Sequence, residues 1–313
     1  MKGIVIRTTG NLYTVISEDG ERIECVLKGK FRVKGIKTTS PLAVGDHVEY
    51  ERPADGTTSV VVDIKKRENY IIRKATKPSK VSHIIAANID QSVVIATLAF
   101  PRTSTGFIDR FLVTSEAYHI PAVIVFNKVD LYDKDLLKKM DQLTRIYEDA
   151  EYPCYPVSAI THDGLEQLKG VVKNKVNLFA GHSGVGKSTL INALEPGLNI
   201  RIKEISQFHE KGKHATTFAE MHPLSFGGFI IDTPGIKEFG LIDFEKTEVA
   251  ERFPEMRRYM HLCRYHNCTH THEPDCAVKK AVEEGIISSS RYENYLRIYY
   301  HKDWDEGEKI LHR

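Results

Sequence analysis

The sequence predicts a mainly parallel α/β domain, preceded by a small all-β barrel and followed by a mainly helical module with a metal site. Five short segments rich in β-branched residues occupy positions 1–68, and strand and helix patterns then alternate to about residue 245. Three clustered cysteines and further helical patterns follow. A chain of 313 residues has room for two or three domains. We therefore expect domains at 1–68, 69–245 and 246–313.

The first 68 residues are expected to fold as an OB-fold barrel. The segments GIVIRTT, LYTVISE, ERIECVL, DHVEYE and TSVVVDIKKR predict five short strands, and Asp19-Gly20 is a strong hairpin signal. A basic loop follows the third strand, and it is either a solvated loop or a contact with an RNA backbone. Its basic residues are Lys28, Lys30, Arg32, Lys34 and Lys37.

The central region is expected to contain a parallel sheet covered on both faces. Its predicted strands are nearly continuous apolar runs, which is typical of strands buried on both sides. They lie in QSVVIATLAF, PAVIVFNK, CYPVSA, KVNLFAG and GGFIIDTPG. Helical patterns separate most of them, and IIRKATKPSKVSHIIAANID, residues 71–90, is predicted to carry basic residues through a turn-prone connection.

The sequence predicts no membrane-spanning segment. No apolar run approaches the ~20 residues of a membrane span, and MKGIVIRTTG lacks the features of a signal peptide. We expect a cytoplasmic protein without a membrane partner, and a monomer by default. The formal net charge of +2 implies nothing about nucleic acid. Cys25 and Cys154 stand alone among apolar residues and are expected in cores.

A phosphate-binding loop is predicted between a buried strand and a helix. The segment GHSGVGKST matches G-x-x-x-x-G-K-[ST] in the context that this motif requires. Its glycines let the backbone wrap a phosphate, Lys187 reaches the β- and γ-phosphates, and Ser188 binds Mg²⁺. The expected nucleotide contacts in this loop are Gly181, His182, Ser183, Gly184, Val185, Gly186, Lys187, Ser188 and Thr189.

Two segments after this loop are predicted to sense the γ-phosphate. Asp232 ends a buried strand in DTPG and would hold Mg²⁺ through a water, while the Gly235 N–H would meet the γ-phosphate. In KGKHATTF, Thr216 or Thr217 would complete the Mg²⁺ shell as a switch residue. Spacing does not choose between them, and we take Thr217 as the working magnesium ligand with Ser188 and Asp232.

The segment NKVD is predicted to read guanine. A carboxylate at Asp130 accepts from both N1–H and N2–H₂, and Asn127 would bind the base edge and tie this loop to the phosphate loop. The Lys128 stem would lie over the ring, and the backbone N–H of Ala159, beside Ser158, would meet O6. Adenine lacks these groups and would leave a buried Asp130 poorly paired, so ATP is the weaker substrate hypothesis.

The order of these motifs is unusual, because the base-reading segment precedes the phosphate loop. A parallel sheet tolerates such a circular permutation, since joining surface termini and cutting elsewhere preserves the core. Here the cut falls between DTPG and NKVD. Gly235 then leads directly into the C-terminal module, so nucleotide state could move that module.

The C-terminal module is expected to hold one structural zinc ion. Cys263, Cys268, His270 and Cys276 match C-x4-C-x-H-x5-C, and three thiolates with one imidazole are a tetrahedral structural set. The module has little apolar material for an independent core, so a metal would stabilise it. Three nearby histidines compete for the histidine role: His261, His266 and His272.

With these motifs in this order, the sequence resembles the circularly permuted ribosome-assembly GTPases called RsgA, also YjeQ or YloQ. The resemblance covers essentially the whole chain through NKVD, GHSGVGKST, GKHATT, DTPG and CRYHNCTHTHEPDC, although the family often has Thr at the position of Ala215. It implies hydrolysis of GTP to GDP, stimulated by the small (30S) ribosomal subunit, late in maturation of that subunit. The implied partners are GTP or GDP and the 30S subunit with its 16S rRNA.

Ile236 stands where many GTPases place a water-orienting glutamine, so slow intrinsic turnover is expected. His214 is the candidate catalytic group, although it could equally be an exposed loop histidine. The runner-up hypothesis is a regulatory GTP switch with a non-ribosomal protein effector, which the basic loops 28–37 and 65–80 disfavour. A third, a P-loop kinase or ATPase, is disfavoured by Asn127 and Asp130.

Overall fold

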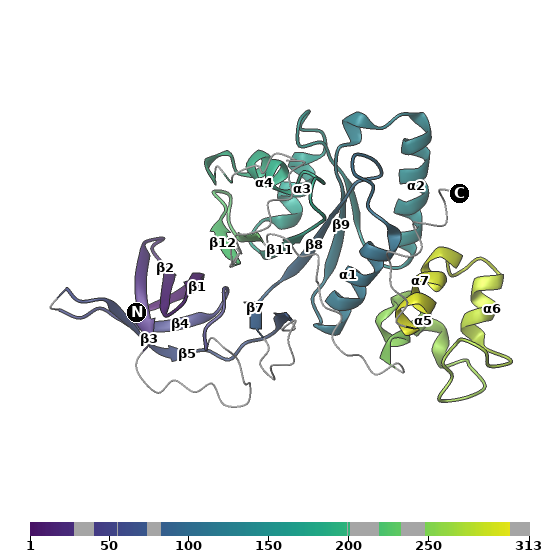
Figure 1. The fold of residues 1–313 in the computed structure, drawn as a ribbon, viewed down its shortest axis with the longest axis horizontal. Coiled ribbons are helices and arrows are strands. Elements are labelled where there is room, and N and C mark those ends of the chain that lie inside the picture. Colours follow the sequence, from purple (N-terminus) through teal and green to yellow (C-terminus); the bar gives the residue numbers. More distant parts are fainter. Residues whose placement is uncertain are drawn as a thin grey trace, which may run out of the picture.

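The computed structural model describes residues 1–27, 41–54, 56–73, 83–198, 200, 219–232 and 248–300. In Figure 1, a strand-rich barrel, a central α/β region and a helical module follow one another along the longest axis of the molecule. The predicted fold class is confirmed in each of these parts. Among the described residues, no helix combines the length and the apolarity needed to cross a membrane.

The barrel consists of five short strands with buried and exposed side chains in alternation. They are β1 (Lys2–Thr9), β2 (Leu12–Ser17), β3 (Arg22–Leu27), β4 (His47–Glu51) and β5 (Ser59–Ile64). Neighbours pair in the order β1-β2-β3-β5-β4, and β4 also pairs with β1, which closes the barrel. Inward side chains such as Val5, Tyr13 and Val61 form one apolar cluster. The expected OB-like barrel is therefore confirmed.

Among the described residues, the central sheet contains five parallel strands followed by one antiparallel strand. They are β8 (Gln91–Ala96), β9 (Ala122–Phe126), β10 (Cys154–Pro156), β11 (Val176–Ala180), β12 (Glu220–Pro223) and β13 (Phe229–Asp232). Their order is β10-β9-β8-β11-β13-β12, with β12 antiparallel to β13. β12 was not predicted from the sequence, because a four-residue strand ending in Pro223 gives no pattern that stands out from a loop.

Helices cover both faces of this sheet, as the apolar strands predicted. They are α1 (Thr105–Ala117), α2 (Lys134–Asp149), α3 (Leu165–Val172) and α4 (Lys187–Leu194). Side chains alternate across β8, so Val94 packs in one cluster with α1 and α2, and Val93 packs in another with α3 and α4. The part of the chain that the structure describes also has the 3₁₀ turns η1 (Val129–Leu131), η2 (Pro196–Leu198) and η4 (Ala250–Arg252).

Two features connect the barrel with the central sheet. β1 pairs with β12 at Arg7 and Glu220, so the barrel and the central strands form one continuous sheet. β6 (Tyr70–Arg73) and β7 (His83–Ala87) form an antiparallel pair where the sequence predicted only a turn-prone connection. The prediction was wrong here because two short strands flanking a basic stretch lack a hairpin turn signal.

The C-terminal module contains α5 (Pro254–Met260), α6 (Ala277–Glu283) and α7 (Ser289–Tyr299). Its buried residues include Phe253, Met256 and Tyr295, and they form one cluster together with Val113 of α1. The module therefore shares its core with the central domain. This corrects the expectation of too little apolar material, because α1 supplies part of the apolar surface.

Candidate functional site

The phosphate loop lies between β11 and α4, and its glycines are needed for close approach. Gly184 and Gly186 both have φ of 86°, a left-handed conformation that other residues adopt at a cost. A Cβ on Gly186 would lie 2.6 Å from Asn127 Nδ2, and one on Gly181 would lie 2.8 Å from the Ile95 carbonyl oxygen. The loop therefore packs directly against the strand end and against the base-reading segment.

Lys187 and Asp232 form an ion pair beside this loop. Lys187 begins α4, and Asp232 ends the neighbouring parallel strand β13, so both side chains come from the same edge of the sheet. Their side chains are only 11% and 13% exposed. Ser188 and Thr189 follow Lys187 on the first turn of α4. Cationic and acidic groups thus meet where a phosphate and its cation would bind.

Asn127 joins the base-reading segment to the two other loops of the site. It follows β9 and is 1% exposed. Its Nδ2 donates to the Val185 carbonyl oxygen at 2.8 Å, and its Oδ1 accepts from the Ala159 N–H at 3.3 Å. The sequence predicted the first contact. The Ala159 N–H, which was expected to meet guanine O6, donates to Asn127 in this structure.

Lys128 makes a second connection to the phosphate loop. Its backbone has φ of 65°, and Nζ donates to the carbonyl oxygens of Gly184 at 2.7 Å and Phe100 at 2.5 Å. Desolvation lowers the pKa of this ammonium group. Two carbonyl contacts hold the Lys128 side chain across the site, with its stem extended between the two loops.

Asp130 is held by the Ser158 loop and remains exposed. Ser158 Oγ donates to Asp130 Oδ1 at 2.5 Å and accepts from the backbone N–H groups of Ile160 and Thr161 at 3.2 and 3.0 Å. Asp130 was discussed above as a buried group, whereas it is exposed here, and Ser158 is fully buried. The carboxylate is thus oriented by a fixed serine and is accessible to a ligand.

Sequence reasoning missed two aromatic residues of this region. The Phe107 ring on α1 lies against the His182 ring of the phosphate loop, with centroids 3.8 Å apart. The Tyr132 hydroxyl donates to the Asn127 carbonyl oxygen at 2.8 Å and accepts from the Leu98 N–H at 2.8 Å. Tyr132 stands two positions after NKVD, but no spacing rule identifies a tyrosine there, and Phe107 resembles any apolar helix residue.

Several predicted site residues lie outside the described residues. These are His214, Thr216, Thr217 and Gly235, together with Ala215, Ile236 and the basic residues 28–37. Their roles therefore stay predictions. The described part of the site consists of the phosphate loop, Asp232, NKVD and the Ser158–Ala159 segment.

The four predicted metal ligands come together in the C-terminal module. One ligand atom from each of Cys263, Cys268, His270 and Cys276 lies within 4.8 Å of the others. His270 Nδ1 lies 3.5 Å from Cys263 Sγ and 3.4 Å from Cys276 Sγ. Four donors that converge in this way fit a tetrahedral cation. The competing histidines are exposed, and they are not part of the cluster: His261, His266 and His272.

The chemistry of the cluster also favours a bound cation. Burial raises the pKa of the Cys268 thiol to about 12 and also raises the pKa of Cys276. Without a cation these groups would remain neutral thiols, whereas a metal ion stabilises thiolates. The described Cys and His donors could therefore hold one metal ion, and they leave no position for a substrate.

A hydrogen-bond network holds the ligand loop in place. Burial alone would raise the pKa of Glu273, but hydrogen bonds from Thr269 and Thr271 outweigh it and lower the pKa to about 2. The Tyr292 hydroxyl on α7 donates to the His270 carbonyl oxygen at 2.6 Å, and Tyr295 donates to the Thr269 carbonyl. The histidine ligand is thereby fixed by α7 as well as by its own loop.

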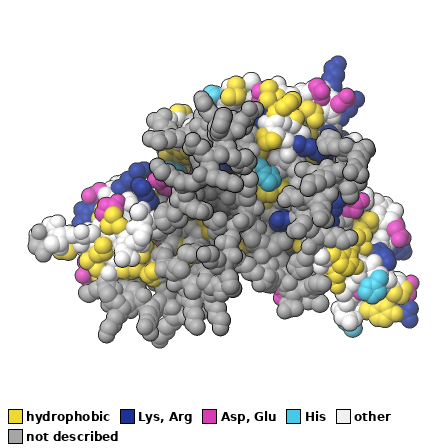
Figure 2. Space-filling view, viewed as in Figure 1, with side chains coloured by type: hydrophobic (Ala, Val, Ile, Leu, Met, Phe, Trp, Pro, Cys, Tyr) yellow, Lys and Arg dark blue, Asp and Glu magenta, His cyan; other side chains and the backbone are white. Residues whose placement is uncertain are grey.

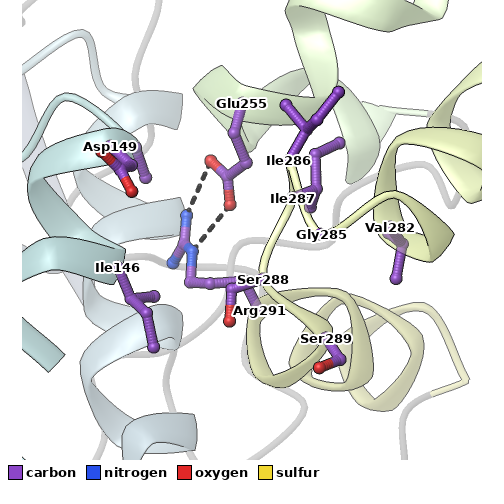
Figure 3. A pocket seen from close by; sticks show the side chains of 11 residues that line it. Ile146, Asp149, Glu255, Val282, Gly285, Ile286, Ile287, Ser288, Ser289 and Arg291 are labelled. Atoms are coloured by element: carbon purple, nitrogen blue, oxygen red, sulfur yellow. Dashed lines mark hydrogen bonds and ion pairs between the residues drawn. The ribbon is translucent and has the colours of Figure 1, made fainter. Parts of the chain in front are cut away.

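A buried ion network joins this module to the central domain. Arg291 of α7 donates to Glu255 of α5 through Nε and Nη2, at 2.7 and 3.1 Å, and through Nη1 to Asp109 of α1 at 2.7 Å. Asn294 also donates to Asp109, at 2.5 Å. Figure 3 shows Arg291 paired with Glu255, with Ile146 of α2 on one side and Val282 of α6 on the other. These residues line a cavity of about 250 Å³.

Comparison with known proteins gives a consistent family. The sequence model of the RsgA GTPase matches residues 64–242, and that of the RsgA N-terminal domain matches residues 2–61. A protein of Bacteroides fragilis called small ribosomal subunit biogenesis GTPase RsgA is 51% identical over 308 residues, 98% of each chain. Its namesake in Christiangramia forsetii is 50% identical over 315 residues, 100% of this chain and 98% of its own.

Two solved structures resemble the whole fold. YjeQ from Thermotoga maritima superposes with a TM-score of 0.79 at 39% identity, over 100% of this chain and 99% of its own. YloQ, described as a circularly permuted GTPase, superposes with a TM-score of 0.75 at 31% identity, over 96% of this chain and 94% of its own. The permuted order inferred from the motifs is thus found in a solved relative.

Proposed function

This chain belongs to the RsgA GTPase family, and we propose on that basis that it hydrolyses GTP to GDP and phosphate in the biogenesis of the small ribosomal subunit. Curated relatives that are similar to this chain over nearly their full length are named for this activity and this process. We propose further that the small subunit with its 16S rRNA stimulates hydrolysis and that the chain acts late in maturation. These finer statements rest on the family resemblance.

The observation that carries the proposal is the position of Asn127. Its amide donates to the phosphate loop and accepts from the Ser-Ala loop, so three segments that are distant in the sequence form one site. Asp130 stands nearby, oriented by Ser158 and exposed, and its carboxylate would accept from guanine N1–H and N2–H₂. Adenine offers no such pair of donors, which supports GTP over ATP.

Mg²⁺ is proposed as the cofactor of hydrolysis. Ser188, Asp232 and Thr217 are the proposed ligands, Asp232 acting through a water, and Lys187 would contact the β- and γ-phosphates. Lys187 and Asp232 pair with each other in this structure. Binding of nucleotide and Mg²⁺ would separate them, because Lys187 would then contact the phosphates and Asp232 would contact the Mg²⁺-bound water. Thr216, Gly235 and the candidate catalytic His214 remain part of this proposal.

Zinc is proposed as the ion of the C-terminal cluster, in a purely structural role. Three thiolates and one imidazole are the donor set that zinc favours, and the convergence of these donors supports the assignment. The ion would add cross-links to a module whose described α-helices are short. We also propose the domain division 1–68, 69–245 and 246–313, which is supported by the closed barrel and by an apolar cluster formed mostly by C-terminal residues.

The basic side chains proposed to contact rRNA are spread over more than one part of the described surface in view. Figure 2 shows Lys and Arg side chains on the barrel, on the central region and on the C-terminal module of the face in view. Such a distribution fits a ligand that spans more than one domain, as a ribosomal subunit would. A monomer in the cytoplasm is the proposed state, since a single chain carries every element named above.

Measurement of GTP hydrolysis by the purified chain tests the proposal. Rates would be compared for the chain alone and with small subunits, large subunits or free RNA. Stimulation by small subunits only is expected, with binding that weakens steeply as salt rises because phosphate contacts release counterions. Tight GTP binding without stimulation by any of these partners would overturn the ribosomal part and favour a protein effector.

A further inference from the structure

The loop that connects β8 to α1, residues 97–104, is a closed structure beside the base-reading segment. Thr97 and Thr103 hold its ends together: the Thr103 N–H donates to the Thr97 carbonyl at 2.7 Å, and Thr103 Oγ1 accepts from the Thr97 N–H at 3.1 Å. Ser104 then caps α1 by accepting from the Phe107 N–H at 3.3 Å. The loop is therefore a defined platform, although none of the nucleotide-binding motifs includes it.

This platform contacts the base-reading segment at two points. The Phe100 carbonyl accepts from Lys128 Nζ at 2.5 Å, and the Leu98 N–H donates to the Tyr132 hydroxyl at 2.8 Å. The same hydroxyl donates to the Asn127 carbonyl at 2.8 Å. One phenol oxygen thus joins the platform to the first peptide of NKVD.

The position of Tyr132 in the turn gives this contact its effect. Asn127 lies at the start of the turn, Lys128 has a left-handed backbone, and the 3₁₀ turn η1 carries Asp130. The Tyr132 N–H closes that turn on the Val129 carbonyl at 3.1 Å, while its side chain reaches back to the Asn127 carbonyl. The side chain therefore spans the turn that presents Asp130, and it is itself 8% exposed.

We propose that Tyr132 is a positioning residue for guanine recognition, which fixes the turn that presents Asp130 against the platform 97–104. This inference rests on the proposed binding of guanine nucleotides. The hydroxyl group of Tyr132, and not its ring, is the part that increases the preference for guanine over other bases. The Tyr132 hydroxyl contacts Leu98 and the Asn127 carbonyl and not the phosphate loop, so base selection should change more than the binding of the phosphates.

The test compares Tyr132→Phe with Tyr118→Phe. Both changes remove one hydroxyl oxygen, and the Tyr118 hydroxyl accepts from the Ile72 N–H at 3.2 Å at the C-terminal end of α1, away from the base-reading segment. Dissociation constants would be measured for GDP, ADP and inosine diphosphate. Inosine diphosphate has the same phosphates and sugar as GDP and keeps the N1–H, but it lacks the 2-amino group. The ratio of its dissociation constant to that of GDP therefore isolates the contact between the 2-amino group and Asp130.

In Tyr132→Phe we expect this ratio to fall about fivefold, the effect of one net hydrogen bond, with GDP binding weakened by a similar factor. Amides of residues 98–104 and 127–131 should also exchange hydrogen faster. Tyr118→Phe should leave the ratio unchanged. A Tyr132→Phe protein that folds with the wild-type ratio and wild-type exchange overturns the positioning role. Equal binding of GDP and ADP by the wild type would instead overturn the guanine assignment, and this inference with it.

Discussion

Asn127 and Lys187 illustrate how single side chains assemble this site. Asn127 directly follows the buried strand β9, and Lys187 follows the loop after the buried strand β11. The sheet therefore fixes the positions of both residues before any ligand binds. Asn127 then joins the three loops by hydrogen bonds, whereas Lys187 is held by the opposite charge of Asp232. The Asn127 hydrogen bonds would remain when nucleotide binds, whereas nucleotide binding would replace the Lys187–Asp232 ion pair.

Lys187→Met should weaken binding of both GDP and GTP by about 100-fold, because it removes charge-assisted hydrogen bonds to the phosphates. Lys169→Met is the matched control, since Lys169 pairs with Glu166 on the surface of α3 at 2.6 Å. Fluorescence titration with labelled nucleotide measures both. Unchanged affinity in Lys187→Met would show that this loop is not the phosphate site.

Cys276→Ala should reduce bound zinc well below one equivalent per chain, because three donors hold the ion less tightly than four. Cys25→Ala is the control, since Cys25 is fully buried in the barrel and is not part of the cluster. Elemental analysis of the purified proteins gives the metal content. Full zinc occupancy in Cys276→Ala, or its loss in Cys25→Ala, would be inconsistent with the assigned ligands.

At the level of elements, α1 connects two functional regions. Phe107 in its first turn lies on the phosphate loop, while Asp109 and Val113 contact the C-terminal module. Arg291 is surrounded by carboxylates and by the rings of Tyr147, Tyr152 and Phe253, at 4.7–5.6 Å from their centroids. The module is therefore attached to α1 by buried charge as well as by apolar packing.

Asp109→Ala should lower the free energy of unfolding by about 3 kcal/mol, because it leaves a buried arginine with one carboxylate fewer. Glu284→Ala removes the exposed pair between Lys280 and Glu284, whose side chains are 74% and 50% exposed, and should cost less than about 1 kcal/mol. Chemical denaturation of both variants gives the difference. Similar losses in the two variants would contradict the structural role of the buried network.

Much of this arrangement could be predicted from local patterns, and the failures have physical causes. Local patterns predict the barrel strands from β-branched segments and the central strands from apolar runs. The spacing of cysteine and histidine predicts the four metal ligands. β12 and the β6–β7 pair leave no such local pattern, because their pairing depends on partners distant in the sequence. Phe107 and Tyr132 were missed for the same reason: their partners are set by the tertiary fold.

At the scale of the whole molecule, permutation changes the connections and leaves the site intact. The parallel strands β9, β8, β11 and β13 lie side by side, so NKVD, the phosphate loop and Asp232 meet at their carboxyl ends whatever their order in the chain. The barrel extends this sheet through β1 and β12, and the C-terminal module is attached at α1. The central domain, which carries the nucleotide site, thus lies between the barrel and the C-terminal module (Figure 1).

The guanine assignment depends most directly on Asp130, so the decisive measurement is nucleotide competition with wild type and Asp130→Asn. GDP should compete far better than ADP or xanthosine diphosphate in the wild type. In Asp130→Asn, GDP affinity should fall at least ~10-fold and xanthosine diphosphate should gain, since an amide donates to the xanthine 2-oxygen. Asp135→Asn, at an exposed aspartate in the first turn of α2, should change neither. Equal binding of ADP and GDP, or unchanged GDP affinity in Asp130→Asn, would contradict a guanine site.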